Sequence, residues 1–118
     1  MKFKYDKDRD DYRMITGRYA SESNAWLRLW AEWLDKMSVI LGYGELTVTS
    51  YIRPEDVHSR HCSGKALDIR VKDKPTIWYM SMVTICKAME MLNRRFHVNP
   101  HYGFFRMKDQ HIHIEVRE

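Results

Sequence analysis

The last strand-like segment of the chain constrains the fold most, because it alternates strictly between ionisable and apolar residues. It reads His111-Ile-His-Ile-Glu-Val116. On a β-strand, residues two apart project to the same face, about 6.6–6.8 Å from each other. His111, His113 and Glu115 therefore share one face. We expect the apolar face to pack on the core, and the three ionisable side chains to be solvated, paired or bound to a metal.

Five further segments have the periodicity of regular structure. Apolar residues at helical spacing predict helices over about residues 21–42 and 75–92. Alternating or β-branched segments predict strands at residues 45–52 and 66–71, and a further short strand near 102–107. This order predicts an α+β domain in which a small, mostly antiparallel sheet of about four strands packs against two main helices.

The length of the chain, 118 residues, suits one ordinary domain and is too short for two. Residues 1–21 are charged and aperiodic, so we expect an N-terminal arm or short helix laid over the domain, which would comprise residues 22–118. Trp26, Trp30 and Trp33 recur at helical spacing and are expected in the core rather than on a sugar-binding surface.

The composition excludes several classes of protein. Twenty Lys and Arg against sixteen Asp and Glu give a net charge of +4, but the basic residues are scattered, so we expect no nucleic-acid partner. No stretch approaches the ~20 apolar residues of a membrane span. The N-terminus has no apolar segment behind its charges, so we expect cytoplasmic synthesis without a signal peptide. Cys62 and Cys86 are expected to remain free thiols.

A second group of candidate ligands lies where a loop leads into a strand, in the segment Ser59-Arg-His-Cys-Ser-Gly-Lys-Ala-Leu-Asp-Ile69. His61 offers an imidazole nitrogen and Asp68 a carboxylate oxygen, both ordinary zinc ligands. One His and one Asp seven positions apart mean little by themselves. Together with two histidines on one face of the last strand, they predict a metal site.

This segment resembles the signature of the zinc D-alanyl-D-alanine carboxypeptidases and related phage endolysin peptidases, whose fold is shared with the hedgehog signalling domain. The signature Ser-x-His-x-x-Gly-x-Ala-x-Asp, followed by Ile, Leu or Phe, is matched here by Ser59, His61, Gly64, Ala66, Asp68 and Ile69. The closing pattern His-Ile-(Asp/Glu)-Val appears as His113-Ile-Glu-Val116. The resemblance covers about residues 22–118. It implies a zinc peptidase that cleaves an amide next to a D-amino acid in peptidoglycan.

The resemblance also implies roles for individual residues. It implies a zinc ion (Zn²⁺) held by His61, Asp68 and His113. Arg53, at a strand end before the signature, is the expected clamp for a substrate carbonyl or carboxylate. Ser59 and Glu115 are expected to orient a ligand or a catalytic residue through hydrogen bonds.

The sequence departs from the resemblance at position 110. Many relatives carry a glutamate there as general base, three residues before the last ligand, whereas this chain has Gln110, which cannot take a proton. Other relatives of wider, lysostaphin-type architecture use His-x-His, with the first histidine in catalysis. In that arrangement His111 is the residue that transfers the proton during catalysis. Gln110 is expected to point to the opposite face of the strand.

Four other residues are weaker candidates. His58 and Cys62 have ligand-like spacing to His61, but they occupy a polar loop and a variable position of the signature. His97 and His101 flank Asn99-Pro and are predicted to lie in a loop, although His101 could reach the cleft.

The sequence therefore predicts a monomeric zinc metallopeptidase acting on the peptide part of bacterial peptidoglycan, of the phage endolysin or wall-modifying kind. Carboxypeptidase and endopeptidase activity are both compatible with it. It would reach the cell wall after synthesis in the cytoplasm, by phage-mediated release for example. Two alternatives remain: a non-catalytic zinc module that binds a peptide or protein partner, and a virion-associated phage component.

Overall fold

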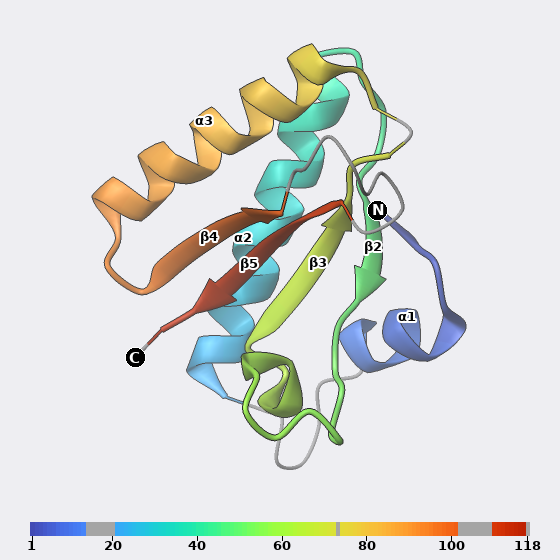
Figure 1. The fold of residues 1–118 in the computed structure, drawn as a ribbon, viewed down its shortest axis with the longest axis vertical. Helices are drawn as coiled ribbons and strands as arrows, with labels where there is room; N and C mark the ends of the chain where they lie inside the picture. The colour runs from blue at the N-terminus through green and yellow to red at the C-terminus, as the bar shows by residue number, and fades with distance from the viewer. Residues whose placement is uncertain (14–20, 73, 102–109, 118) are drawn as a thin grey trace.

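The computed structural model describes residues 1–13, 21–72, 74–101 and 110–117. Its elements, in chain order, are β1 (Lys2–Phe3), α1 (Asp6–Arg13), α2 (Glu22–Ile40), β2 (Thr47–Ser50), the 3-10 helix η2 (Arg60–Ser63), β3 (Ala66–Arg70), α3 (Thr76–Leu92), β4 (Phe96–His101) and β5 (His111–Val116). The strands form one sheet in the order β1-β2-β3-β5-β4 (Figure 1). The predicted α+β class is confirmed.

The sheet differs from the prediction in strand number and in direction. Within the described residues it has five strands rather than about four, and it is mixed, because β1 runs parallel to β2 while the other neighbouring pairs are antiparallel. A third helix, α1, accompanies the two predicted ones. The two-residue strand β1 is too short to leave a periodic pattern in the sequence.

The prediction missed β4, which contains Pro100 and lies at the edge of the sheet. Proline cannot donate to the hydrogen-bond ladder and is tolerated in edge strands, so Asn99-Pro100 resembles a loop unless the position of the strand is known. The strand predicted near residues 102–107 lies outside the described residues.

Helix α2 begins where the side chain of Ser21 accepts a hydrogen bond from the backbone N–H of Asn24. Its buried face carries Leu27, Trp30, Ala31 and Leu34. Of the three tryptophans expected in the core, only Trp30 is buried, and its ring meets Phe96 of β4 edge to face at 4.9 Å. Trp26 and Trp33 are 36% and 44% exposed.

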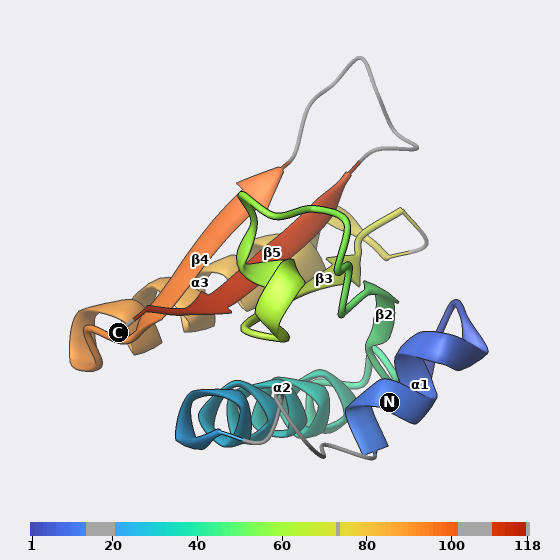
Figure 2. The same ribbon diagram turned by 90° about the horizontal axis from the view of Figure 1, so that it is seen from below.

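The apolar face of the sheet is covered by α2 and α3, and Figures 1 and 2 show both helices against the strands. Trp78, Met82 and Cys86, four residues apart along α3, are its buried side chains. They join Ile69 of β3 and Ile114 of β5 in one core cluster. Both cysteines are free, as predicted.

The opposite face of the sheet carries the ionisable side chains of β5. Ile112, Ile114 and Val116 lie in the core cluster, so the alternation places His111, His113 and Glu115 on the other face. Asp68 of β3 lies directly across from His113 in the antiparallel register, and therefore on the same face. None of the helices in the described residues is long and apolar enough to cross a bilayer.

The N-terminal segment joins this domain through both of its elements. β1 extends the sheet, and Tyr12 of α1 is buried in the core cluster. The hydroxyl of Tyr12 donates a hydrogen bond to Glu32 of α2 at 2.7 Å. Further along the segment, the ammonium of Lys7 donates to the carbonyl oxygen of Ile52 at 3.1 Å. Helix α1 thus lies against the loop that follows β2.

Candidate metal centre

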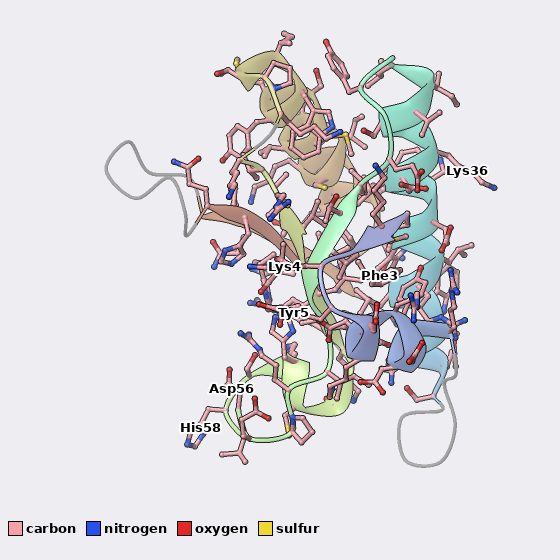
Figure 3. The ribbon with its side chains drawn as sticks, turned by 90° about the vertical axis from the view of Figure 1, so that its right-hand side faces the viewer. Phe3, Lys4, Tyr5, Lys36, Asp56 and His58 are labelled. Atoms are coloured by element: carbon pink, nitrogen blue, oxygen red, sulfur yellow. The ribbon has the colours of Figure 1, made fainter. Side chains whose placement is uncertain are left out.

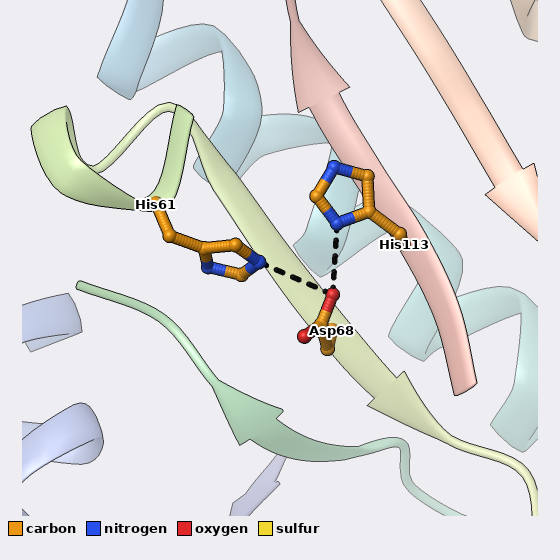
Figure 4. A group of neighbouring side chains, drawn as sticks. All are labelled: His61, Asp68 and His113. Atoms are coloured by element: carbon orange, nitrogen blue, oxygen red, sulfur yellow. Dashed lines mark hydrogen bonds and ion pairs between the residues drawn. The ribbon is translucent and has the colours of Figure 1, made fainter. Parts of the chain in front are cut away.

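Three of the predicted site residues converge on the polar face of the sheet, as Figure 4 shows for His61, Asp68 and His113. One ligand atom from each lies within 4.8 Å of the others, and the cluster could hold a metal ion. Asp68 and His113 come from neighbouring strands, whereas His61 comes from η2, which leads into β3. The metal-site prediction is confirmed in this coarser sense.

His61 is fully buried, and one of its hydrogen bonds fixes its tautomer. Nδ1 lies 2.6 Å from the carbonyl oxygen of Tyr51. A carbonyl oxygen only accepts, so Nδ1 must carry a proton. In the neutral imidazole, Nε2 then presents its lone pair, and Nε2 lies 3.2 Å from Oδ1 of Asp68. The ring is therefore oriented as a ligand through Nε2.

His113 lies between two carboxylates. Nδ1 is 2.9 Å from Oδ1 of Asp68, and Nε2 is 2.9 Å from Oε1 of Glu115. A neutral imidazole has one proton for these two partners. If Nε2–H donates to Glu115, the lone pair of Nδ1 faces Asp68. A carboxylate behind a ligand histidine is the usual means of fixing its tautomer and raising its basicity.

Glu115 is itself held in place by two arginines. Nε of Arg60 and Nε of Arg117 lie 2.6 Å and 2.8 Å from its Oε2, which leaves Oε1 for His113. Burial would raise the pKa of Glu115, but the bonds from Arg117 and His113 lower it below its ordinary value. Glu115 is thus a charged acceptor behind His113.

The electrostatics of the cluster favour an anionic Asp68 and a cation between the three residues. Burial would raise the pKa of Asp68. In the absence of a metal ion, hydrogen bonds in which a proton lies between Asp68 and each imidazole, that of His113 and then that of His61, lower it well below its usual range. Burial would lower the pKa of His113, yet Asp68 and then Glu115 raise it. Lone pairs of two imidazoles facing one carboxylate oxygen require a shared proton or a metal ion to bridge them.

The spacing of the donors also fits a metal ion. Ligand atoms ~2.0–2.2 Å from a tetrahedral ion lie about 3.4 Å apart. The separations of 3.2 Å and 2.9 Å between Asp68 and the two imidazoles need a small expansion, and all three ligand atoms lie within 4.8 Å of one another. Two imidazole nitrogens and one carboxylate oxygen form the three-ligand set of an open zinc site.

The loop that presents His61 is closed by several local contacts. The hydroxyl of Ser59 accepts a hydrogen bond from the backbone N–H of His61 at 3.2 Å, so Ser59 caps η2 at the residue that carries the imidazole. At the other end, Gly64 adopts φ +71°, and a Cβ there would lie 3.1 Å from Nδ2 of Asn24. That amide donates to the carbonyl of Ser63 at 3.1 Å and ties η2 to α2.

A cavity of about 390 Å³ adjoins the triad and holds the two residues predicted to be catalytic. Asp68, His111 and Arg53 all line it. Nε2 of His111 lies 3.7 Å from Oδ1 of Asp68, and the His111 side chain is 29% exposed. The structure thus brings His111 and Arg53 to the same opening beside the candidate metal ligands.

Gln110, the residue before β5, is buried and lines the same cavity as His111. Gln110 precedes the first residue of β5, so the strict alternation of a strand does not extend to it.

Three of the four weaker candidates lie outside the triad. His58 is exposed in the loop after β2, as Figure 3 shows. His97 belongs to β4 rather than to a loop, and its Nδ1 lies 3.5 Å from Glu90. Cys62 is half-buried in η2, with Sγ 3.7 Å from the carbonyl oxygen of Pro54. The side chain of His101 is outside the described part of the chain.

Sequence reasoning missed the groups that support the ligands. The backbone of Tyr51 and the side chains of Arg60 and Arg117 have no periodic or motif signal of their own. Arg60 occupies a variable position of the signature segment. Only Glu115, two residues from a ligand on the same strand face, was recognisable from spacing.

Comparisons with models of protein families, with curated proteins and with solved structures found no match for this chain.

Proposed function

We propose that this protein is a zinc metallopeptidase that hydrolyses an amide bond in the peptide part of bacterial peptidoglycan, as a phage endolysin-type or wall-modifying enzyme. The observation that carries the proposal is the convergence of His61, Asp68 and His113 from two separate segments of the sequence. Those segments are the two that resemble the zinc D-alanyl-D-alanine peptidases. A carboxylate behind His113 adds the support that ligand histidines usually have.

Zinc is the metal that best suits this donor set, because two imidazoles and one carboxylate form its usual catalytic environment. Bound there, it would supply Lewis acidity that activates water and polarises the scissile carbonyl. Asp68 contributes the negative charge that neutralises part of the cation. Its lowered pKa keeps it ionised at working pH.

His111 and Arg53 are the proposed catalytic residues of the cavity. His111 lies near Asp68 and is partly exposed, so its imidazole can exchange a proton with a reacting group in the opening. Arg53 contributes a fixed positive charge that can hold a substrate carbonyl or carboxylate. Gln110 lines the same cavity and can donate or accept a hydrogen bond, but it cannot act as a base.

Gln110 is also the observation that favours a second function, a non-catalytic zinc module that binds a peptide or protein partner. A chain without a carboxylate at position 110 to act as general base could retain the ion for binding alone. A virion-associated protein that opens the wall locally is a variant of the first proposal. Monomeric action and attack on the cell wall belong to the same proposal.

Two measurements on one preparation test it. Metal analysis of the purified protein should find about one zinc per chain, because the three ligands form one open site. Zinc-loaded protein should release new amines from purified peptidoglycan, and mass spectrometry of the products would identify the bond. Asp68→Ala should lose both zinc and activity.

His58→Ala is the matched control, because His58 is an exposed histidine outside the cluster, and it should retain both properties. A folded protein that binds no transition metal after zinc is supplied would contradict the proposal entirely. Zinc without any release of amines would favour the binding module.

A further inference from the structure

Four basic side chains converge on the cavity beside the candidate metal centre. Lys4 follows β1, Arg53 follows β2, Arg70 ends β3 and Lys72 comes two residues later. Lys4, Arg53 and the pair Arg70 and Lys72 come from three distant parts of the sequence, which only the fold brings to one cavity. Figure 3 shows Lys4 and Phe3 on opposite sides of β1, and Phe3 packs against the core cluster. The direction of Lys4 therefore follows from the anchoring of its neighbour.

Among the described residues that line this cavity, basic side chains outnumber carboxylates, because Asp68 is their only carboxylate and its oxygen already meets His61 and His113. One of the cations, Arg53, also has Asp56 3.7 Å from its guanidinium. Like charges gathered around one opening repel one another and destabilise the folded state. A bound anion would relieve that repulsion, and a cleft lined by one sign of charge concentrates ligands of the opposite sign.

The positive surface continues away from the metal centre. A second cavity of about 650 Å³ shares Lys4 and Arg70 with the first and adds Lys2 and Lys74 to its lining. Its carboxylate, Glu45, accepts a hydrogen bond from the N-terminal ammonium at 2.6 Å. A ligand that extends from the candidate metal centre along this path would meet successive cations.

One cation near the metal is accounted for by the proposed function, because Arg53 is the expected clamp for a substrate carbonyl or carboxylate. Lys4, Arg70 and Lys72 are additional to that clamp. The first cavity, at about 390 Å³, has the size of a small-ligand site. Arginine holds a carboxylate with two parallel hydrogen bonds, and lysine adds a point charge.

We propose that Lys4, Arg70 and Lys72 form a subsite for a second free carboxylate of the substrate, remote from the scissile amide. The protein then selects peptides that carry at least two carboxylates over peptides in which one of them is amidated. This inference takes the peptide nature of the ligand from the proposed function. The basic residues Lys4, Arg70 and Lys72 are the basis for the further claim that the peptide is selected by its charge.

The test compares two non-hydrolysable peptides that differ only in one side-chain carboxyl group, free in one and amidated in the other. Isothermal titration calorimetry with zinc-loaded protein should give a Kd roughly tenfold lower for the free carboxylate, as expected for one charge-assisted contact. The Lys4→Gln/Lys72→Gln double variant should lose this preference. Both lysines are exposed, so the variant should keep its fold and its zinc content.

Lys36→Gln is the matched control, because Lys36 is exposed on α2, away from Lys4 in Figure 3, and its loss changes the charge without touching either cavity. It should preserve the preference. Equal binding of the two peptides, or no binding of either, overturns the inference even if the protein digests cell wall. Selective binding of the free-carboxylate peptide, in a protein that hydrolyses no cell wall, would support the subsite and contradict the proposed peptidase activity.

The last comparison uses inorganic polyphosphate as the ligand. If it binds more tightly than the free-carboxylate peptide, and the double variant abolishes that binding, the cavity recognises a phosphate polymer. The proposal of a peptide carboxylate is then wrong.

Discussion

The carboxylate of Asp8 in α1 accepts a hydrogen bond from the backbone N–H of Tyr51 at 3.3 Å. The carbonyl oxygen of the same Tyr51 lies 2.6 Å from Nδ1 of His61. Asp8 therefore fixes the residue whose carbonyl orients a candidate metal ligand. Helix α1 contributes to the site without reaching it.

Removing this support should weaken metal binding. Asp8→Ala leaves a buried N–H without its acceptor, so we expect roughly tenfold lower zinc affinity, the lower end of the effect of groups behind metal ligands. Asp8→Asn keeps an acceptor oxygen and should bind zinc nearly as the parent does. A competitive chelator titration measures both.

Asp10→Ala is the control for this series, because Asp10 is an exposed carboxylate on the same helix. Unchanged zinc affinity in Asp8→Ala would mean that the loop holds Tyr51 in place without α1.

Gly64 should be intolerant of a side chain for two separable reasons. Its φ of +71° disfavours any other residue by about 1–2 kcal/mol, and a Cβ would press on Asn24 and Ile52. Gly42 has a similar φ of +86° but nothing within 4 Å of its Cβ position. Gly42→Ala therefore measures the backbone effect alone.

We expect Gly64→Ala to lower the free energy of unfolding more than Gly42→Ala in urea denaturation. It should also lower zinc affinity, because Gly64 ends the turn that carries His61. Equal losses of stability in the two variants would show that η2 moves aside without strain.

His111→Ala should separate catalysis from metal binding. The variant retains the three proposed ligands, so it should keep its zinc and lose roughly 10²–10⁴-fold in turnover, the usual size of a general acid–base contribution. Gln110→Ala should lose much less, because an amide cannot transfer the proton. Turnover of a defined peptidoglycan fragment and zinc content would be measured on both. Loss of zinc from His111→Ala would make His111 a ligand.

The hydrogen bond that joins α3 to β4 should make stability depend on pH. Oε2 of Glu90 accepts from the backbone N–H of Val98 at 2.9 Å. Burial would raise the pKa of Glu90, but this bond and the charges of Lys87 and His97 lower it. A carboxyl whose pKa is lower in the folded state stabilises the protein above its unfolded pKa and loses that effect as pH falls through the folded value.

Glu90→Gln should therefore be about 1 kcal/mol less stable than the parent at pH 7 in urea denaturation. The difference should shrink as the pH falls through about 4 and below. Glu55→Gln, at an exposed position, should show no such dependence. A Glu90→Gln deficit that persists undiminished at pH 3 would assign the loss to packing rather than to charge.

The two long helices and the polar face of β5 were predictable because their patterns are local. Leu27, Trp30 and Leu34 repeat at the helical period, and His111, His113 and Glu115 at the strand period. These periods reflect which side of an element faces the core. Trp26 and Trp33 are exposed, because α2 carries more apolar residues than its buried face can accommodate. Helical spacing alone therefore does not tell which of the tryptophans are buried.

By itself, the sequence determined the α+β class, the core face of β5 and the three residues that could hold a metal. Only the tertiary structure decided the edge position of β4 with its Pro100, the pairing of β1, and the place of Gln110 in the cavity. It also decided the contact of Asp8 with Tyr51, 43 residues away, and the placement of Lys4 and Arg70 around one cavity. The physical reason is that periodicity records only local geometry and burial. Hydrogen bonds and charges between distant segments depend on how those segments are brought together.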